Sequence, residues 1–225
     1  MRLKLYELLK IEKMWEDLRL ELEFGKIHGW SDKEVVPSKI FKFIRKNLKR
    51  GRAVGPDGFP YEFLKYAHKN VWIVLEYITN IFLNLGSFPK QYCIDRESPL
   101  FKKNDIRDTN NYRPVRLSSC IGKVITDAIR QTFLAPRVLQ LSNSQYGYRE
   151  NRRCDDLIFD LTQKIWLRSK YKKSSLVAFI DLRRAFDSVW REGLWLKLHQ
   201  KGVSNRIINF FYQMYKRNET RICLP

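Results

Sequence analysis

The chain has 225 residues, of which 44% are hydrophobic and 14% aromatic, a composition that excludes a disordered polypeptide. The formal net charge of +19 favours a polyanionic partner, because each Lys or Arg that neutralises a phosphate releases counterions. A basic protein without such a partner is the alternative. The cysteines are widely spaced and form no CxxC pair, which argues against a zinc site or a disulfide framework: Cys93, Cys120, Cys154 and Cys223.

No apolar run reaches the roughly 20 residues that a membrane span needs, so we expect no membrane association. The first residues pass directly into a charged helical pattern, which does not resemble a signal peptide. We therefore expect an intracellular protein of the nucleus or the cytoplasm.

Hydrophobic periodicity and turn residues predict an α+β chain. Helices are expected at 3–24, from Pro37 to Gly51, at 61–85 with Gly86 closing the helix, and at about 120–140, 155–172, 190–201 and 205–218. Residues 54–60 form a turn cluster, 95–118 a polar hairpin, 176–180 a strand buried on both faces, and 220–224 a short strand.

The segment from Ala178 to Trp190 is the most informative part of the sequence, because Asp181 directly follows an apolar run. A carboxylate at the end of a buried strand is costly unless the charge is paired or binds a cation such as Mg²⁺. The role of Asp181 remains open: it is either a metal ligand, or else a helix N-cap or a partner of Arg183 or Arg184.

Four motifs in order resemble those of non-LTR retrotransposon reverse transcriptases. Phe179 to Val189 (F-x-D-L-x-x-A-F-D-x-V) resembles motif A of that family, and Gly55 to Gly58 resembles its GPDG element. Leu100 to Lys103 with Asn111 to Val115 resembles its LFKK…NYRPI hairpin, and Ser144 to Arg149 resembles its QYGFR element. The resemblance implies a right-hand polymerase fold: an N-terminal helical extension at 1–50, fingers at 51–174 and a partial palm at 175–225.

The resemblance also implies roles for motif A. Asp181 would be the first metal-binding aspartate of a two-metal site that uses Mg²⁺, and the backbone carbonyl of Leu182 would face the second metal or the triphosphate. Phe186 stands five residues after Asp181, where the family keeps an aromatic ring beneath the incoming sugar. The alternative for Phe186 is core packing. Asp187 is interpreted as a cap of the next helix.

Further implied roles fall on the hairpin and on the QYGYR element. Lys102, Lys103 and Arg113 would bind the nucleoside triphosphate, with a solvated charged hairpin as the alternative. Contacts with the template would come from Arg149 and Arg152 to the backbone, and from Tyr146 and Tyr148 stacking on a base, unless the two rings only pack. A basic run before motif A either extends a template track or is a solvated face: Lys164, Arg168, Lys170, Lys172 and Lys173.

The family's next element, a Y/F-x-D-D hairpin, is missing, since no pair of adjacent aspartates follows Asp181. We therefore expect a fragment that stops before the second half of the catalytic site and is inactive alone. The longer protein would copy an RNA template onto a DNA primer from deoxynucleoside triphosphates. The alternative is a non-catalytic module, a relic or domesticated fingers domain, that only binds nucleic acid.

Overall fold

The computed structural model describes residues 2–28, 34–138, 141–149, 151–182, 185–186 and 188–222. It divides the chain into a larger unit, Met1–Arg137 with Glu192–Pro225, and a smaller unit, Val138–Arg191. Helices and a small sheet occur together, which confirms the α+β prediction. The two units do not follow the borders expected for fingers and palm, and those borders remain a prediction.

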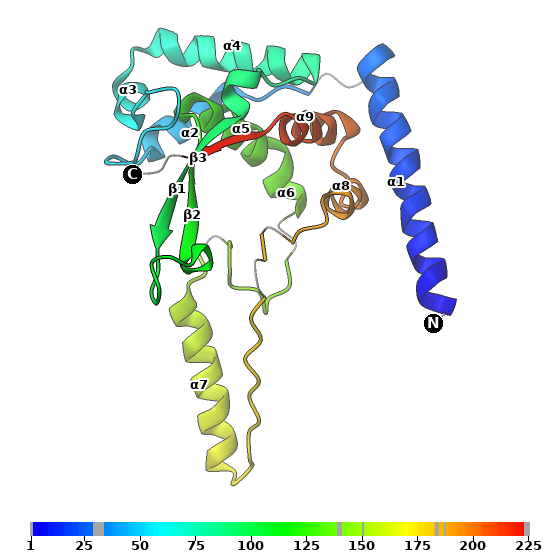
Figure 1. Cartoon of the computed structure of the whole chain (residues 1–225), viewed down its shortest axis with the longest axis vertical. Helices are drawn as coiled ribbons and strands as arrows, with labels where there is room; N and C mark the ends of the chain where they lie inside the picture. Colours follow the sequence, from blue (N-terminus) through cyan, green and yellow to red (C-terminus); the bar gives the residue numbers. More distant parts are fainter. Residues whose placement is uncertain are drawn as a thin grey trace. The chain divides into compact units, whose positions relative to one another are not determined.

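Helices make up most of the chain (Figure 1). They are α1 (Arg2–His28), α2 (Ser38–Asn47), α3 (Tyr61–Tyr66), α4 (Lys69–Leu85), α5 (Cys120–Ile129), a π-helical turn η3 (Arg130–Leu134), α6 (Ala135–Val138), α7 (Cys154–Lys170), α8 (Arg191–Gln200) and α9 (Asn205–Lys216), with short 3₁₀ turns at Lys90–Cys93 and Thr109–Asn111. The helices expected beyond residue 120 are thereby confirmed, with small shifts at their ends. No helix in the described ranges is long and apolar enough to cross a membrane.

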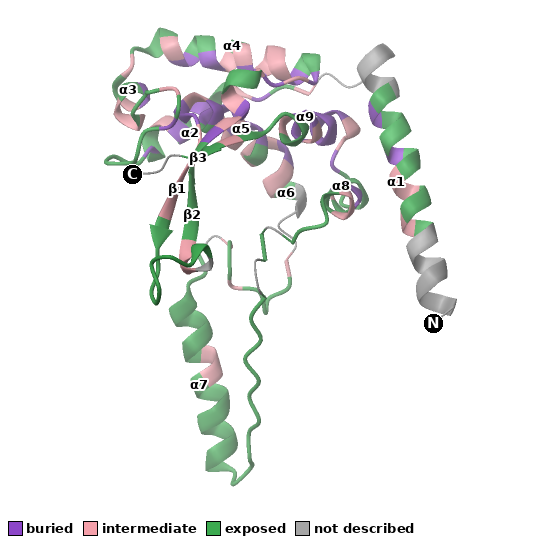
Figure 2. Ribbon diagram, in the orientation of Figure 1, coloured by how far each residue is buried: buried purple, intermediate pink, exposed green. Residues whose placement is uncertain are grey.

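The core of the larger unit lies where α2, α4, α5 and α9 meet, and Figure 2 shows its buried residues. Phe41 of α2, Ile125 of α5 and Phe210 of α9 are almost completely buried there. Buried polar side chains of α9 bind the C-terminus of α4: Arg206 donates to the Leu83 carbonyl at 3.1 Å, and Asn209 donates to the Gly86 carbonyl at 3.3 Å. These bonds link α9 to carbonyls at the end of α4, of which that of Leu83 also accepts the backbone N–H of Gly86 at 3.2 Å.

Two helix boundaries differ from the prediction. The helix expected at 61–85 is two helices, because Ala67 and His68 are extended and the side chain of His68 caps α4. Arg45 of α2 binds the freed carbonyls, at 2.7 Å from Ala67 and 3.4 Å from Lys65, so tertiary contacts override a continuous apolar pattern. Gly86 closes α4 at φ 56°, as predicted. The helix expected to end at Gly51 already ends at Asn47.

The sheet has three strands in the order β2-β1-β3. Strands β1 (Ile94–Phe101) and β2 (Tyr112–Leu117) are antiparallel, which confirms the predicted hairpin. Strand β3 (Glu219–Ile222) confirms residues 220–222 of the predicted terminal strand, of which 223 and 224 lie outside the described residues. It pairs in parallel with β1, Ile94 lying opposite Glu219. Nothing local in the sequence indicates this second pairing.

The buried strand predicted at 176–180 is wrong for the described structure. Residues 176–180 form no strand, and Phe179 and Ile180 are 87% and 88% exposed. An apolar run becomes a buried strand only when neighbouring strands and a covering layer exist, and no described strand pairs with it. Figure 2 shows this segment and α7 of the smaller unit as almost entirely exposed.

Candidate functional site

The Gly55–Gly58 turn holds the start of α5. A Cβ atom at Gly55 would lie 2.3 Å from the carbonyl oxygen of Ser118, so only glycine fits. The hydroxyl of Ser119 donates to Asp57 at 2.6 Å and accepts the backbone N–H of Gly122 at 3.0 Å, which caps α5. The turn thereby fixes the segment that joins strand β2 to α5. The Gly55–Gly58 motif therefore has a structural role in this chain.

Three of the predicted site residues lie at the far end of the β1–β2 hairpin. Arg113 lies opposite Leu100, and the backbone N–H of Lys102 donates to the Asn111 carbonyl at 2.8 Å, which continues the ladder. Side chains alternate along a strand, so Lys102 shares a face with Arg113, whereas the rings of Phe101 and Tyr112 meet on the other face. This register distinguishes Lys102 from Lys103, which the sequence alone leaves equivalent.

The hairpin tip between the strands is well fixed. The Asn111 side chain donates to the Asp105 carbonyl at 2.8 Å, and the Tyr112 hydroxyl donates to the Ile106 carbonyl at 2.9 Å. Lys102, Lys103 and Arg113 are exposed, and within the described residues none of their side chains makes an ion pair. The three cations are therefore exposed and take part in no described ion pair, an arrangement suited to an anionic ligand.

The QYGYR element lies in the smaller unit, in the loop before α7. The hydroxyl of Tyr146 donates to the Asp160 carboxylate of α7, and the guanidinium of Arg152 lies over the Tyr146 ring at 5.2 Å from its centroid. Arg149 donates to the Ser142 carbonyl at 3.0 Å and to the Asn143 side chain at 3.4 Å. Both arginines are therefore held in place, and Tyr146 is tied to the helix.

Tyr148 is presented differently. Its ring is 89% exposed and its φ is 57°, a left-handed conformation that non-glycine residues rarely adopt. The ring lies edge to face with Phe186 of motif A, with centroids 6.3 Å apart and planes at 88°. The structure thus brings together one aromatic residue from each of two predicted motifs, and this contact has no signature in the sequence.

Asp181 and Leu182 are both exposed. Within the described residues there is no group of three or more His, Cys, Asp or Glu side chains that could hold a metal ion. One carboxylate does not fit a two-metal site, so the residues described here do not by themselves accommodate the expected Mg²⁺ pair. Arg183, Arg184 and Asp187, and with them the predicted cap, lie outside the described residues.

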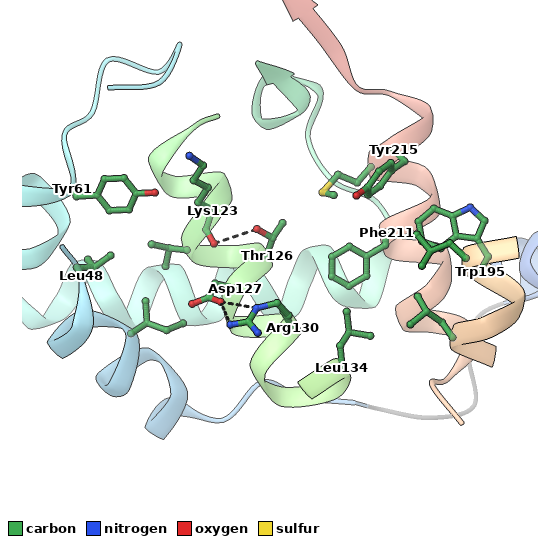
Figure 3. Close-up of a pocket in the computed structure, with 15 residues that line it drawn as sticks. Leu48, Tyr61, Lys123, Thr126, Asp127, Arg130, Leu134, Trp195, Phe211 and Tyr215 are labelled. Carbon is green, nitrogen blue, oxygen red and sulfur yellow. Dashed lines mark hydrogen bonds and ion pairs between the residues drawn. The ribbon is translucent and has the colours of Figure 1, made fainter. Parts of the chain in front are cut away.

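An apolar hollow of about 610 Å³ lies in the larger unit, and none of the residues that line it is a predicted site residue (Figure 3). Its walls come from α2, α5, α8 and α9, and include Leu48, Trp195 and Phe211. At its rim, Asp127 forms an ion pair with Arg130 at 2.7 Å. The sequence did not predict the hollow. Apolar spacing shows which face of a helix is buried, but it does not show where neighbouring helices leave that face incompletely packed.

The buried cysteines are unsuited to nucleophilic chemistry. Cys93, Cys120 and Cys154 are free thiols, and the first two are buried. Burial, with a further contribution from the Asp57 carboxylate, raises the pKa of the Cys120 thiol to about 11, so this thiol stays protonated at neutral pH. Cys223 lies outside the described residues.

Comparison with known protein families identifies the family of this chain. Residues 101–223 match the model of the family described as "Reverse transcriptase (RNA-dependent DNA polymerase)". The match begins within the β1–β2 hairpin and includes the QYGYR loop and motif A. The chain belongs to this family.

Curated relatives indicate which type of reverse transcriptase the chain resembles. The chain is 27% identical over 171 residues to the "Probable RNA-directed DNA polymerase from transposon BS" of Drosophila melanogaster, a match that covers 73% of this chain and 19% of the relative. It is 26% identical over 159 residues to the "RNA-directed DNA polymerase from mobile element jockey" of the same species, covering 69% of this chain and 17% of the relative. A polyprotein of the type-1 retrotransposable element R2 from Popillia japonica is 22% identical over 125 residues, covering 56% of this chain and 17% of the relative.

These relatives place the chain with reverse transcriptases of the non-LTR retrotransposon type. The chain spans less than a fifth of the length of the relatives that it matches.

Proposed function

We propose that the chain is the fingers and the first part of the palm of a right-hand polymerase, and that the longer protein adds deoxynucleotides to a DNA primer on an RNA template. Residues 51–174 would be the fingers, 175–225 the start of the palm and 1–50 an N-terminal extension. The observation that carries the proposal is the family match over 101–223, which contains the cationic hairpin and motif A.

In this proposal the hairpin binds the triphosphate of the incoming nucleotide. Arg113 would make planar, bidentate contacts with phosphate oxygens, and Lys102 would add a point charge from the same face. Lys103, at the bend that follows, would contact the nucleotide less directly. The exposure of all three side chains and the absence of a described ion pair support this role.

The QYGYR loop would contact the template. Arg149 and Arg152 would neutralise backbone phosphates from fixed positions, and the exposed ring of Tyr148 would stack on a base. Tyr146 is half-buried and bonded to Asp160, which favours a supporting role over stacking.

In motif A, Asp181 would be one carboxylate of a Mg²⁺ site, and Leu182 would offer its backbone carbonyl beside it. The other carboxylates are not supplied by the described residues, so we derive no catalytic step for the chain alone. Phe186 would lie beneath the sugar and exclude a 2′-hydroxyl.

A second candidate is a non-catalytic module that binds nucleic acid. The observation that favours it is the net charge of +19, which can bind a polyanion without any catalytic site. We expect the 225-residue chain to extend no primer on an RNA template with Mg²⁺ or Mn²⁺. Incorporation of labelled deoxynucleotide measures this directly. Incorporation that Asp181→Ala abolishes would contradict the expectation and show that another acidic residue completes the site.

Binding by the chain should depend steeply on salt. Each phosphate contact with a single strand should contribute about 0.7 to the slope of log Kd against log salt concentration. Arg152→Ala, which removes a proposed contact with the template backbone, should lower that slope by roughly the contribution of one contact, whereas Arg19→Ala on α1 should leave it nearly unchanged. Anisotropy titrations of a labelled RNA oligonucleotide at several salt concentrations measure both slopes. A flat dependence would reject phosphate binding.

A further inference from the structure

The charges of α7 and the turn after it are segregated along the chain. Asp155, Asp156 and Asp160 lie in the first half of the helix, and no acidic residue occurs from Leu161 to Ile180. The second half and the turn carry only cations: Lys164, Arg168, Lys170, Lys172 and Lys173. The helix dipole favours acids at the N-terminus and cations in the last turn, but Lys172 and Lys173 lie beyond the helix. Helix stability therefore does not explain the whole run.

The turn that follows α7 is held in one conformation. The guanidinium of Arg168 donates twice to the Ser174 carbonyl, at 2.9 and 3.2 Å. The backbone N–H of Lys173 donates to the Arg168 carbonyl at 2.9 Å, and Lys172 adopts φ 55°. These bonds fix the backbone that carries Tyr171, Lys172 and Lys173, so the three side chains project from a preorganised turn.

Two aromatic rings are exposed within this basic region. The Trp166 side chain is 59% exposed, with the Lys170 ammonium 5.5 Å from its ring centroid, one helical turn further on. Tyr171 is 66% exposed. Exposed rings flanked by cations are the combination that binds single-stranded nucleic acid, since bases stack on the rings while the cations follow the phosphates.

We propose that this α7-end cluster, defined as Trp166, Arg168, Lys170, Tyr171, Lys172 and Lys173, binds single-stranded nucleic acid. The inference rests on the proposed function in that the chain handles a polynucleotide, and it adds a site distinct from the hairpin and the QYGYR loop. Bases stack on Trp166 and Tyr171, and Lys172 and Lys173 contact the backbone. Because stacking needs unpaired bases, the cluster prefers a single strand to a duplex.

The first test removes the rings. Trp166→Ala with Tyr171→Ala should weaken binding of a labelled single-stranded RNA by at least about 30-fold, from the loss of two base-stacking contacts, and leave binding of a duplex of equal length unchanged. The matched control is Tyr66→Ala with Tyr77→Ala, two rings that are 63% and 69% exposed elsewhere in the chain. Circular dichroism checks that each variant is folded. Unchanged single-strand binding, or equal losses for single strand and duplex, would overturn the proposal.

The second test reverses charges. Lys172→Glu with Lys173→Glu should weaken single-strand binding and lower the salt slope by about 1.4, the contribution of two phosphate contacts. Lys10→Glu with Lys13→Glu changes the net charge equally on α1, beside Glu12 and Glu16, and should have a much smaller effect. Equal effects of the two pairs would overturn the proposal. If only the cluster proposal fails, the unmodified chain still binds the oligonucleotide. If the unmodified chain binds no oligonucleotide at all, the proposed function fails as well.

Discussion

Gly55→Ala should lower the free energy of unfolding by about 3 kcal/mol, as expected for an added methyl group in a closely packed site. The new Cβ atom would lie 2.3 Å from the Ser118 oxygen and 2.7 Å from the Ser118 carbonyl carbon. Both are backbone atoms, so no flexible side chain can move aside. The turn must separate from the β2–α5 junction, and the bond between Ser119 and Asp57 is then lost.

Two substitutions separate this clash from other effects of adding a methyl group. Gly58→Ala places a side chain at φ 71° without a close neighbour and should cost only about 1 kcal/mol of backbone strain. Gly147→Ala introduces neither a close contact nor a side chain at positive φ, so it should leave the free energy of unfolding nearly unchanged. Urea unfolding followed by circular dichroism gives the three values. If Gly55→Ala were no worse than Gly58→Ala, the turn would not pack against the junction as described.

These values bear on function because the turn supports the hairpin. The segment that Gly55 and Asp57 hold begins where β2 ends, and β2 carries Arg113. At a temperature where the variant remains folded, we expect Gly55→Ala to weaken nucleoside triphosphate binding less than Arg113→Ala does. The Gly55–Gly58 turn would then affect binding only by positioning and stabilising the hairpin, without contacting a ligand.

The elements predicted well are those whose signals are local. A short run from Pro99 to Phe101, a charged tip and the segment from Tyr112 to Leu117 identify the β1–β2 hairpin, and Gly86 marks the end of α4. The break at Ala67 depends on Arg45 from another helix, and the pairing of Ile94 with Glu219 joins residues far apart in the sequence. Hydrophobic periodicity indicates neither the helix break nor the pairing of β1 with β3, so neither was predicted.

The apolar run before Asp181 illustrates a different limit. Its composition favours burial, but burial also requires partners, and no described strand supplies them. The residue types of the candidate site were likewise predictable from motifs, whereas their geometry was not. Side-chain alternation in the hairpin groups Lys102 with Arg113, and the contact between Tyr148 and Phe186 emerges only from the fold.

Phe186→Ala should raise the ratio of ribonucleotide to deoxynucleotide incorporation at least about tenfold in a longer protein that restores the palm, since relief of about 1.4 kcal/mol in the transition state changes a rate tenfold. The proposed reason is steric. Asp181 fixes the position of the triphosphate, the triphosphate fixes the sugar, and a ring five residues later occupies the space of a 2′-hydroxyl. Incorporation efficiencies for both nucleotides, in variant and parent, give the ratio.

The alternative, that Phe186 is only a packing residue, makes a different prediction. A buried phenylalanine costs about 3–5 kcal/mol when it is truncated to alanine, and both activities would then fall together. In this chain Phe186 is 78% exposed and meets only the edge of Tyr148 among the described aromatic rings, so its truncation should leave the stability of the 225-residue chain nearly unchanged. Phe179→Ala is the matched control, because Phe179 lies within the apolar run before Asp181 and should lower both activities equally if the longer protein buries it. An unchanged ratio for Phe186→Ala would reject the steric role, whatever the stability of the chain.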